Sequence, residues 1–120
     1  MILKILPYEL TLCKVLSPVE INLFADFFFI GKTDEELSLV CITSDVPMHT
    51  TDRHDGWRGF RIEGEVDDQV CEVSSLSSAL IGSHIDILSV STFNTDYILV
   101  RGDELSRAVA VLEDKGYMVQ

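Results

Sequence analysis

The polar stretch between residues 45 and 56 holds the residue types that could bind a metal ion. His49 and His54 stand there among Asp45, Asp52 and Asp55. Ligands of protein metal sites usually come at short, regular spacings on a helix or a hairpin, and these five residues lack such a spacing. The stretch is therefore predicted to be an exposed loop or linker, and neither a metal ion nor another cofactor is expected.

Two further combinations resemble catalytic motifs by residue type alone. Ser83, His84 and Asp86 are the residue types of a hydrolase triad. However, triad members come from separate elements, and strand alternation sends Ser83 and His84 to opposite faces. Residues 31–33 (GKT) resemble the end of a phosphate-binding loop, but Asp26 stands where that motif needs its first glycine. The sequence therefore predicts a protein that is not an enzyme.

The three cysteines favour a structural role. Cys13, Cys41 and Cys71 are odd in number, widely spaced and without a C-x-x-C pair, which fits neither a disulfide framework nor a zinc site. Free cysteine is among the residue types most often buried, so they are expected to be small core residues.

Size and charge limit the possible partners. The chain has 120 residues, enough for one ordinary domain or two very small ones, and 47% of them are hydrophobic. Its 20 acidic and 9 basic residues give a net charge of −11, which opposes binding to nucleic acid or to an anionic membrane. No apolar run approaches the ~18 residues needed to span a bilayer, and the start of the sequence lacks a signal-peptide pattern. A cytoplasmic protein is expected.

The elements that must position any site differ between the two halves. In the first half, residues 8–17, 26–30 and 36–43 are predicted strands, and the turn-forming residues 31–34 join the last two as a hairpin. In the second half, the predicted strands are residues 57–63, 85–92, 97–101 and 117–120, with helices over 65–82 and 103–115.

Residues 57–120 thus follow the order βαββαβ. This is the ferredoxin-like α+β arrangement, an antiparallel sheet with both helices on one face. Residues 1–56 are interpreted as a truncated version of the same unit, so two tandem units, 1–56 and 57–120, are expected to pack into one core.

Three separate runs of this sequence resemble the tandem ACT-domain proteins. They are residues 33–41 (TDEELSLVC), residues 56–58 (GWR) and residues 91–100 (STFNTDYILV), the last followed by a predicted helix. The same runs are similar to the ACT pairs of CASTOR-type arginine sensors. The resemblance implies a non-enzymatic regulatory module in which ACT units pack side by side and hold an amino acid at their interface.

The resemblance also implies which residues contact the ligand. They come from one strand, one strand-to-helix loop and one turn: Ser38, Leu39 and Val40; Gly64, Glu65, Val66 and Asp67; Phe93, Asn94, Thr95 and Asp96. The strand would offer backbone groups to the α-amino and carboxylate ends, and Asp96 would supply a charge. From the residues alone, Asp96 is better interpreted as a turn residue that caps the backbone, and only the resemblance makes the two interpretations equal.

The acidic residues of the loop indicate the ligand class. A helix N-terminus attracts a carboxylate, but Glu65, Asp67 and Asp68 crowd this one and would repel it. An acidic pocket favours a ligand with an additional cation, such as arginine or lysine. The first hypothesis is thus a sensor of a free, cationic amino acid, forming a homodimer and acting on an unidentified protein partner. The alternative is an ACT-like interaction or dimerisation module that has lost its ligand.

Overall fold

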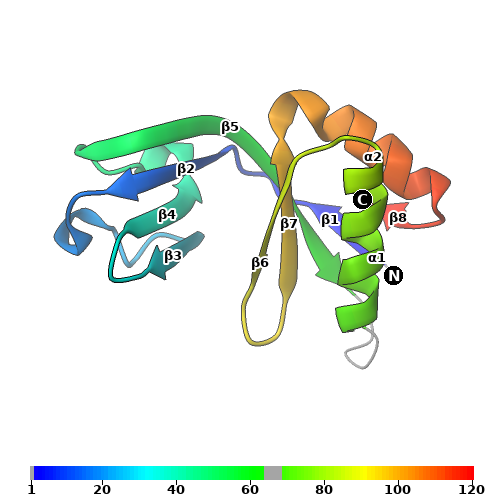
Figure 1. The fold of residues 1–120 in the computed structure, drawn as a ribbon, viewed down its shortest axis with the longest axis horizontal. Coiled ribbons are helices and arrows are strands. Elements are labelled where there is room, and N and C mark those ends of the chain that lie inside the picture. Colours follow the sequence, from blue (N-terminus) through cyan, green and yellow to red (C-terminus); the bar gives the residue numbers. More distant parts are fainter. Residues whose placement is uncertain (1, 64–68) are drawn as a thin grey trace. The chain divides into compact units, whose positions relative to one another are not determined.

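The computed structural model describes residues 2–63 and 69–120, and it divides into two compact units (Figure 1). Unit 1 comprises Met1–Pro7 and Arg58–Gln120, and unit 2 comprises Tyr8–Trp57. The division expected at residues 56 and 57 is therefore close to the second boundary, but it assigned the first seven residues to the wrong unit. These residues form a strand of unit 1, as described next.

Unit 1 contains the βαββαβ order predicted for residues 57–120. Its elements along the chain are β1 (Ile2–Ile5), the second part of β5 (Thr50–Glu63), α1 (Gln69–Gly82), β6 (Ile87–Ser91), β7 (Asp96–Arg101), η4 (Gly102–Glu104), α2 (Leu105–Asp114) and β8 (Met118–Val119). The α+β, ferredoxin-like fold class is thus present in this unit.

The sheet of unit 1 contains an additional strand. β1 lies between β5 and β8, antiparallel to β5 and parallel to β8, while β7 pairs with β5 and β6. The expectation of a purely antiparallel sheet was therefore wrong. Four residues carry too little pattern to reveal a pairing with a strand more than fifty residues away.

Both helices of unit 1 share one hydrophobic core with its sheet. The buried residues of this core come from strands, helices and the connection after α1: Leu3, Phe60, Ile62, Leu76, Leu80, Ile85, Ile98, Val100, Ala108 and Leu112. Ala108 and Leu112 lie on the face of α2 that the apolar spacing predicts, and Leu76 and Leu80 do the same in α1. Alternation along β5 and β7 places the strand residues on the face toward the helices.

α1 is followed, two residues after its end, by a residue in the left-handed conformation. Gly82 ends the helix as predicted, but His84 takes the left-handed conformation with φ at 63°. The amide of Ile85 then donates to the carbonyl of Leu80 over 3.0 Å, which closes the last turn. Arg107 of α2 donates to the carbonyl of Ser83 over 2.7 Å and so joins the two helices.

Unit 2 is a four-stranded antiparallel sheet. Along the chain it contains β2 (Leu10–Val15), η1 (Pro18–Glu20), β3 (Phe28–Lys32), β4 (Leu37–Ile42), η2 (Thr43–Asp45) and the first part of β5. The strand order is β3-β4-β2-β5, and the predicted hairpin is the β3–β4 pair. Cys13, Val15, Ile21, Leu39 and Cys41 are buried together in its core. Residues 8–57, all of them described, contain no α-helix.

The predicted loop over residues 45–56 is largely strand. Thr50–Gly56 form the first half of β5 and pair with β2, where the register shifts twice. Asp52 and Gly56 have positive φ values of 48° and 83°, which accompany these irregularities. The charged residues of this half-strand are exposed. Its composition is therefore that of a loop, which is why the sequence predicted one.

Candidate functional site

Asp96 begins β7 directly after the turn of the β6–β7 hairpin. The Ser91 hydroxyl donates to its carboxylate, and the amide of Thr92 donates to the carbonyl of Thr95 over 2.8 Å. Phe93 is fully exposed and Asn94 is exposed as well. The geometry thus supports the interpretation of Asp96 as a residue that stabilises its own hairpin.

The second predicted segment, Ser38, Leu39 and Val40, lies in the interior of the unit 2 sheet. β4 pairs with β2 on one side and with β3 on the other across all three residues. The backbone of this segment is therefore engaged in the sheet, and its contact with a ligand stays a prediction. Leu39 and Val40 are buried, whereas the Ser38 hydroxyl donates to Glu36 Oε1 over 2.8 Å.

The third predicted segment, Gly64, Glu65, Val66 and Asp67, lies outside the described residues. β5 ends before it at Glu63, whose carboxylate is 3.7 Å from the ammonium group of Lys4, and α1 begins after it at Gln69. The Ser38 segment belongs to unit 2 and the Asp96 segment to unit 1, so each is described within its own unit.

Two hollows in unit 1 have the volume of small-molecule sites. One, of about 430 Å³, follows the end of α1 and is lined by Ile81, His84, Ile85, Asp86 and Ile87. The other, also about 430 Å³, is a groove lined by Ser75, Ser78, Ala79, Lys115 and Tyr117. Neither contains a residue that the sequence predicts to bind ligand.

A third hollow, of about 340 Å³, lies in unit 2 beside the turn of the β3–β4 hairpin, and we call it the hairpin hollow. Its lining includes two cations, Lys14 and Lys32, and three carboxylates, Asp34, Glu35 and Glu36. Both signs of charge thus face one space, which suits a zwitterion. Glu36 accepts the hydrogen bond from the Ser38 hydroxyl, so this predicted ligand residue contacts a residue that lines the hollow.

Unit 2 contains a network of polar side chains that the sequence did not predict. Thr11 is completely buried, and its hydroxyl donates to Asp55 Oδ1 over 2.7 Å and lies 3.0 Å from the Thr43 hydroxyl. Arg53 Nε donates to the same Asp55 oxygen over 2.9 Å. The hydrogen bonds from Arg53 and then from Thr11 hold the pKa of Asp55 below its ordinary value. Asp55 therefore stays ionised at neutral pH and is a poor proton acceptor.

The buried cysteines are unsuited to nucleophilic chemistry. Burial raises the pKa of Cys13, and burial, with a smaller effect of Cys13, raises the pKa of Cys41 to about 12. The thiolate is the reactive form, so both side chains behave as core residues, as their sequence context predicts.

The histidines of the predicted loop serve no metal site in the described part of the chain. His49 Nδ1 lies 2.9 Å from Glu20 Oε1, and this pair is exposed. Among the described residues, no three His, Cys, Asp or Glu side chains gather as metal ligands. Nor does any described helix combine the length and the apolar character that crossing a bilayer requires.

Comparison with known proteins assigns a family to this fold. A family model for the ACT domain matches residues 52–114. A solved structure of a protein from Agobacterium tumefaciens is 30% identical, with a TM-score of 0.87, over 99% of this chain and 91% of that one. No curated protein matches the sequence.

Two more distant structures share the fold. A Vibrio cholerae protein of unknown function is 13% identical, with a TM-score of 0.72, over 92% of this chain and 85% of that one. A chain from Porphyromonas gingivalis, assigned to the C-terminal regulatory domain of an aspartate kinase, is 15% identical, with a TM-score of 0.55, over 94% of this chain and 96% of that one.

Proposed function

The chain belongs to the ACT-domain family, and from this premise we propose that it is a regulatory protein that binds a free amino acid. The observation that carries the proposal is the family match over residues 52–114, which covers most of the βαββαβ unit. The fold shared with a regulatory domain of an aspartate kinase agrees with a regulatory role.

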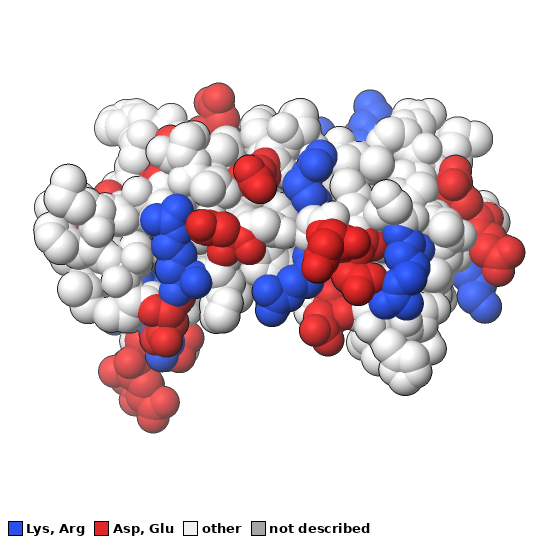
Figure 2. Space-filling view, turned by 90° about the horizontal axis from the view of Figure 1, so that it is seen from above, with Lys and Arg blue, Asp and Glu red and all other residues white. Residues whose placement is uncertain are grey.

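The charges favour a ligand with an additional cation. The chain carries a net charge of −11, and basic side chains on the face shown in Figure 2 lie beside acidic ones. A neutral or acidic amino acid would bring at least one carboxylate to this surface without a compensating second cation. We therefore propose arginine or lysine as the ligand class.

Of the three hollows described above, the hairpin hollow suits such a ligand best. A ligand carboxylate would pair with Lys32, and the two ligand cations would pair with carboxylates such as Glu36. Ionic hydrogen bonds of this kind are stronger than neutral ones, although exposed pairs are screened by salt. The predicted ligand residues of unit 1 do not belong to the lining of this hollow, so mutagenesis can distinguish the two positions.

A thermal-shift screen of the full chain against each of the twenty amino acids tests the proposal. A ligand at about 100 times its Kd stabilises the native state by about 2.7 kcal/mol, which corresponds to a shift of several degrees. We expect arginine or lysine to shift the melting temperature and calorimetry to give saturable binding. If no amino acid shifts it, the sensor function is wrong.

Variants locate the site once a ligand is found. Glu36→Gln and Lys32→Gln should weaken binding, and Glu113→Gln, at an exposed carboxylate near the end of α2, is the control with the same change in charge as Glu36→Gln. Asp96→Asn tests the alternative position in the β6–β7 hairpin. Loss of binding only with Asp96→Asn would keep the function and move the site.

Homodimer formation is a separate proposal. β6 pairs only with β7 among the described strands, so its other edge carries backbone groups that a second copy could pair with. We expect light scattering after size exclusion to give the mass of a dimer. A mass of 13.4 kDa at all concentrations would contradict it.

A further inference from the structure

Unit 2 exposes five large apolar side chains on its connections; Leu16, 67% exposed, lines the hairpin hollow, and the other four lie farther along two connections. The exposed fractions are 89% for Val19, 64% for Leu23, 96% for Phe24 and 87% for Met48. Isolated exposed apolar residues are ordinary on protein surfaces, whereas a group of them often marks a contact with another protein. We call these four residues the apolar loop surface.

The two connections lie side by side. Glu20, next to Val19, is joined to His49, next to Met48, by a contact of 2.9 Å between Oε1 and Nδ1. Ile21 of the first connection is buried in the core of unit 2, and Val46 of the second packs against that same core. Val19 and Met48 therefore stand next to two residues in contact, and Leu23 and Phe24 follow Val19 on the same connection.

Local hydrogen bonds order the longer connection. The Ser17 hydroxyl accepts from the amide of Val19 over 3.3 Å and begins the 3-10 helix η1. Asn22 Oδ1 accepts from the amide of Phe24 over 3.1 Å. The apolar side chains are thus presented by a backbone that is already arranged, which lowers the entropy lost when a partner binds.

Acidic residues stand within three positions of the apolar loop surface in the sequence, and we call them its acidic border. Glu20 precedes the buried Ile21, Asp26 follows Phe24 by two residues, and Asp45 precedes Met48 by three. Two of the cations of unit 2 are already engaged, since Lys14 lies 3.7 Å from Asp52 and Arg53 lies 2.9 Å from Asp55. A second copy of this chain, at a net charge of −11, would meet like charge here, as would an anionic lipid surface.

We infer that the apolar loop surface binds a protein segment that carries both apolar and basic side chains. The apolar side chains of that segment would cover Phe24 and its neighbours, and its cations would pair with the acidic border. Such a segment would belong to the protein that this regulator acts on. The inference does not depend on amino-acid binding, because the hairpin hollow shares no residue with this surface.

A labelled peptide of leucine and lysine, patterned as an amphipathic helix, is the first probe. Fluorescence anisotropy with the full chain at physiological salt should show saturable binding. Peptides of leucine with glutamate, and of serine with lysine, separate the apolar from the electrostatic requirement, and neither should bind as tightly. Equal binding of the serine–lysine peptide would mean that charge alone is recognised, and it would overturn the inference.

Variants of the chain test the location. Phe24→Ser should weaken binding about tenfold or more, since a large apolar side chain at the centre of an interface commonly contributes that much. Met118→Thr, at a side chain of β8 that is 57% exposed, is the apolar control and should change nothing. Unchanged circular dichroism and melting temperature verify that both variants are folded.

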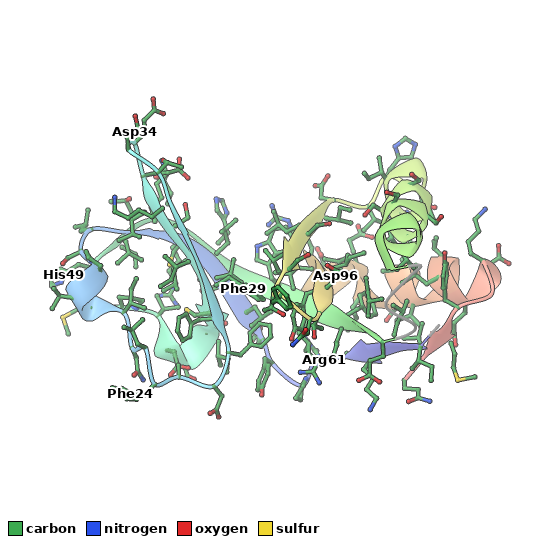
Figure 3. All side chains as sticks on the ribbon, turned by 90° about the horizontal axis from the view of Figure 1, so that it is seen from below. Phe24, Phe29, Asp34, His49, Arg61 and Asp96 are labelled. Carbon is green, nitrogen blue, oxygen red and sulfur yellow. The ribbon has the colours of Figure 1, made fainter. Side chains whose placement is uncertain are left out.

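A matched pair of charge variants tests the acidic border. Neutralising Glu20, Asp26 and Asp45 together should weaken binding and reduce its dependence on salt. Neutralising Asp34, Glu35 and Glu36 removes the same charge from the hairpin tip, which lies far from Phe24 within unit 2 (Figure 3), and should have less effect.

Three further results would overturn the inference. They are absence of saturable binding, binding that Phe24→Ser does not weaken, and self-association that Phe24→Ser abolishes. The last would identify a second copy as the occupant. Amino-acid binding measured on the same variants keeps the two proposals distinguishable, since Phe24→Ser should leave it unchanged.

Discussion

Gly59, in the second part of β5, occupies a position where a single methyl group has a measurable effect. A Cβ there would lie 2.7 Å from Leu99 Cδ2, 3.0 Å from Leu6 Cδ1 and 3.7 Å from the carbonyl oxygen of Ile98. Leu99 is completely buried and Leu6 is 4% exposed, so neither side chain has free space to move into. The backbone of β5 can approach these leucines because residue 59 lacks a side chain.

The size of the effect follows from two opposing contributions. Placing an additional methyl group in a packed core costs about 1 to 3 kcal/mol. Replacing glycine by alanine in a strand returns roughly 0.5 to 1 kcal/mol, because the unfolded chain loses conformational freedom. Gly59→Ala should therefore lower the free energy of unfolding by about 1 kcal/mol and the melting temperature by a few degrees.

Urea denaturation followed by circular dichroism measures this change, with Gly31→Ala as the matched control. Gly31 is also a strand glycine, but its nearest neighbour to an added Cβ is the Ser38 Cβ at 4.0 Å, so that variant should be as stable as the parent or slightly more stable. In the Gly59→Ala background, Leu99→Val should cost less than it does alone, because it removes the atom that the new methyl group meets. Equal stability of the two alanine variants would refute the reasoning.

Three other side-chain environments lead to predictions of the same kind. Hydrogen bonds, first of all from Arg53, lower the pKa of Asp55 in the folded chain. Its ionised form therefore stabilises the fold above the unfolded pKa of about 4. This contribution is lost as the pH falls through the lower folded pKa. Asp55→Asn should therefore flatten the dependence of the urea midpoint on pH between about pH 5 and pH 2; a slope equal to that of the parent would contradict this. Burial raises the pKa of Cys41 to about 12 and also raises the pKa of Cys13. Iodoacetamide at about pH 8 should therefore label these two thiols only in the presence of urea, as mapped by mass spectrometry. Rapid labelling of the native chain would argue against their burial. Arg107→Gln should lower the free energy of unfolding by about 1 kcal/mol in the same urea assay, because hydrogen bonds to the carbonyls after α1 are lost, and an unchanged midpoint would show that these exposed contacts do not stabilise the fold.

Apolar periodicity was sufficient to predict most elements of unit 1. The stripe containing Ala108 and Leu112 identifies α2 and its buried face, and the alternation of residues 57–63 identifies the second part of β5. The first part of β5 has no such pattern, because its side chains are mostly charged and exposed. It is a strand because β2 pairs with it, and that long-range pairing leaves no local trace in the sequence.

The candidate site was less predictable than the fold. A resemblance can indicate that Ser38 or Asp96 touches a ligand, but it does not reveal that both backbone edges of residues 38–40 are paired within the sheet or that Ser91 bonds to Asp96. Thr11 shows the same limit. A threonine in an apolar strand gives no sign that its hydroxyl meets a carboxylate 44 residues away.

The pairing of β1 with β5 has a topological consequence. These strands are antiparallel neighbours, with Ile5 opposite Phe60 and the amide of Leu6 donating to the carbonyl of Gly59 over 2.8 Å, so Pro7 and Arg58 stand where the two arms of a hairpin meet. Unit 2 therefore occupies the place of a hairpin loop, as a folded insertion between two consecutive strands of the ACT unit. Replacing it by a short Asn-Gly turn would leave the hydrogen-bonded ladder of unit 1 intact. The chain thus enters and leaves unit 2 at two neighbouring positions, Pro7–Tyr8 and Trp57–Arg58, so a change in the length of unit 2 need not change the register of the β1–β5 pair.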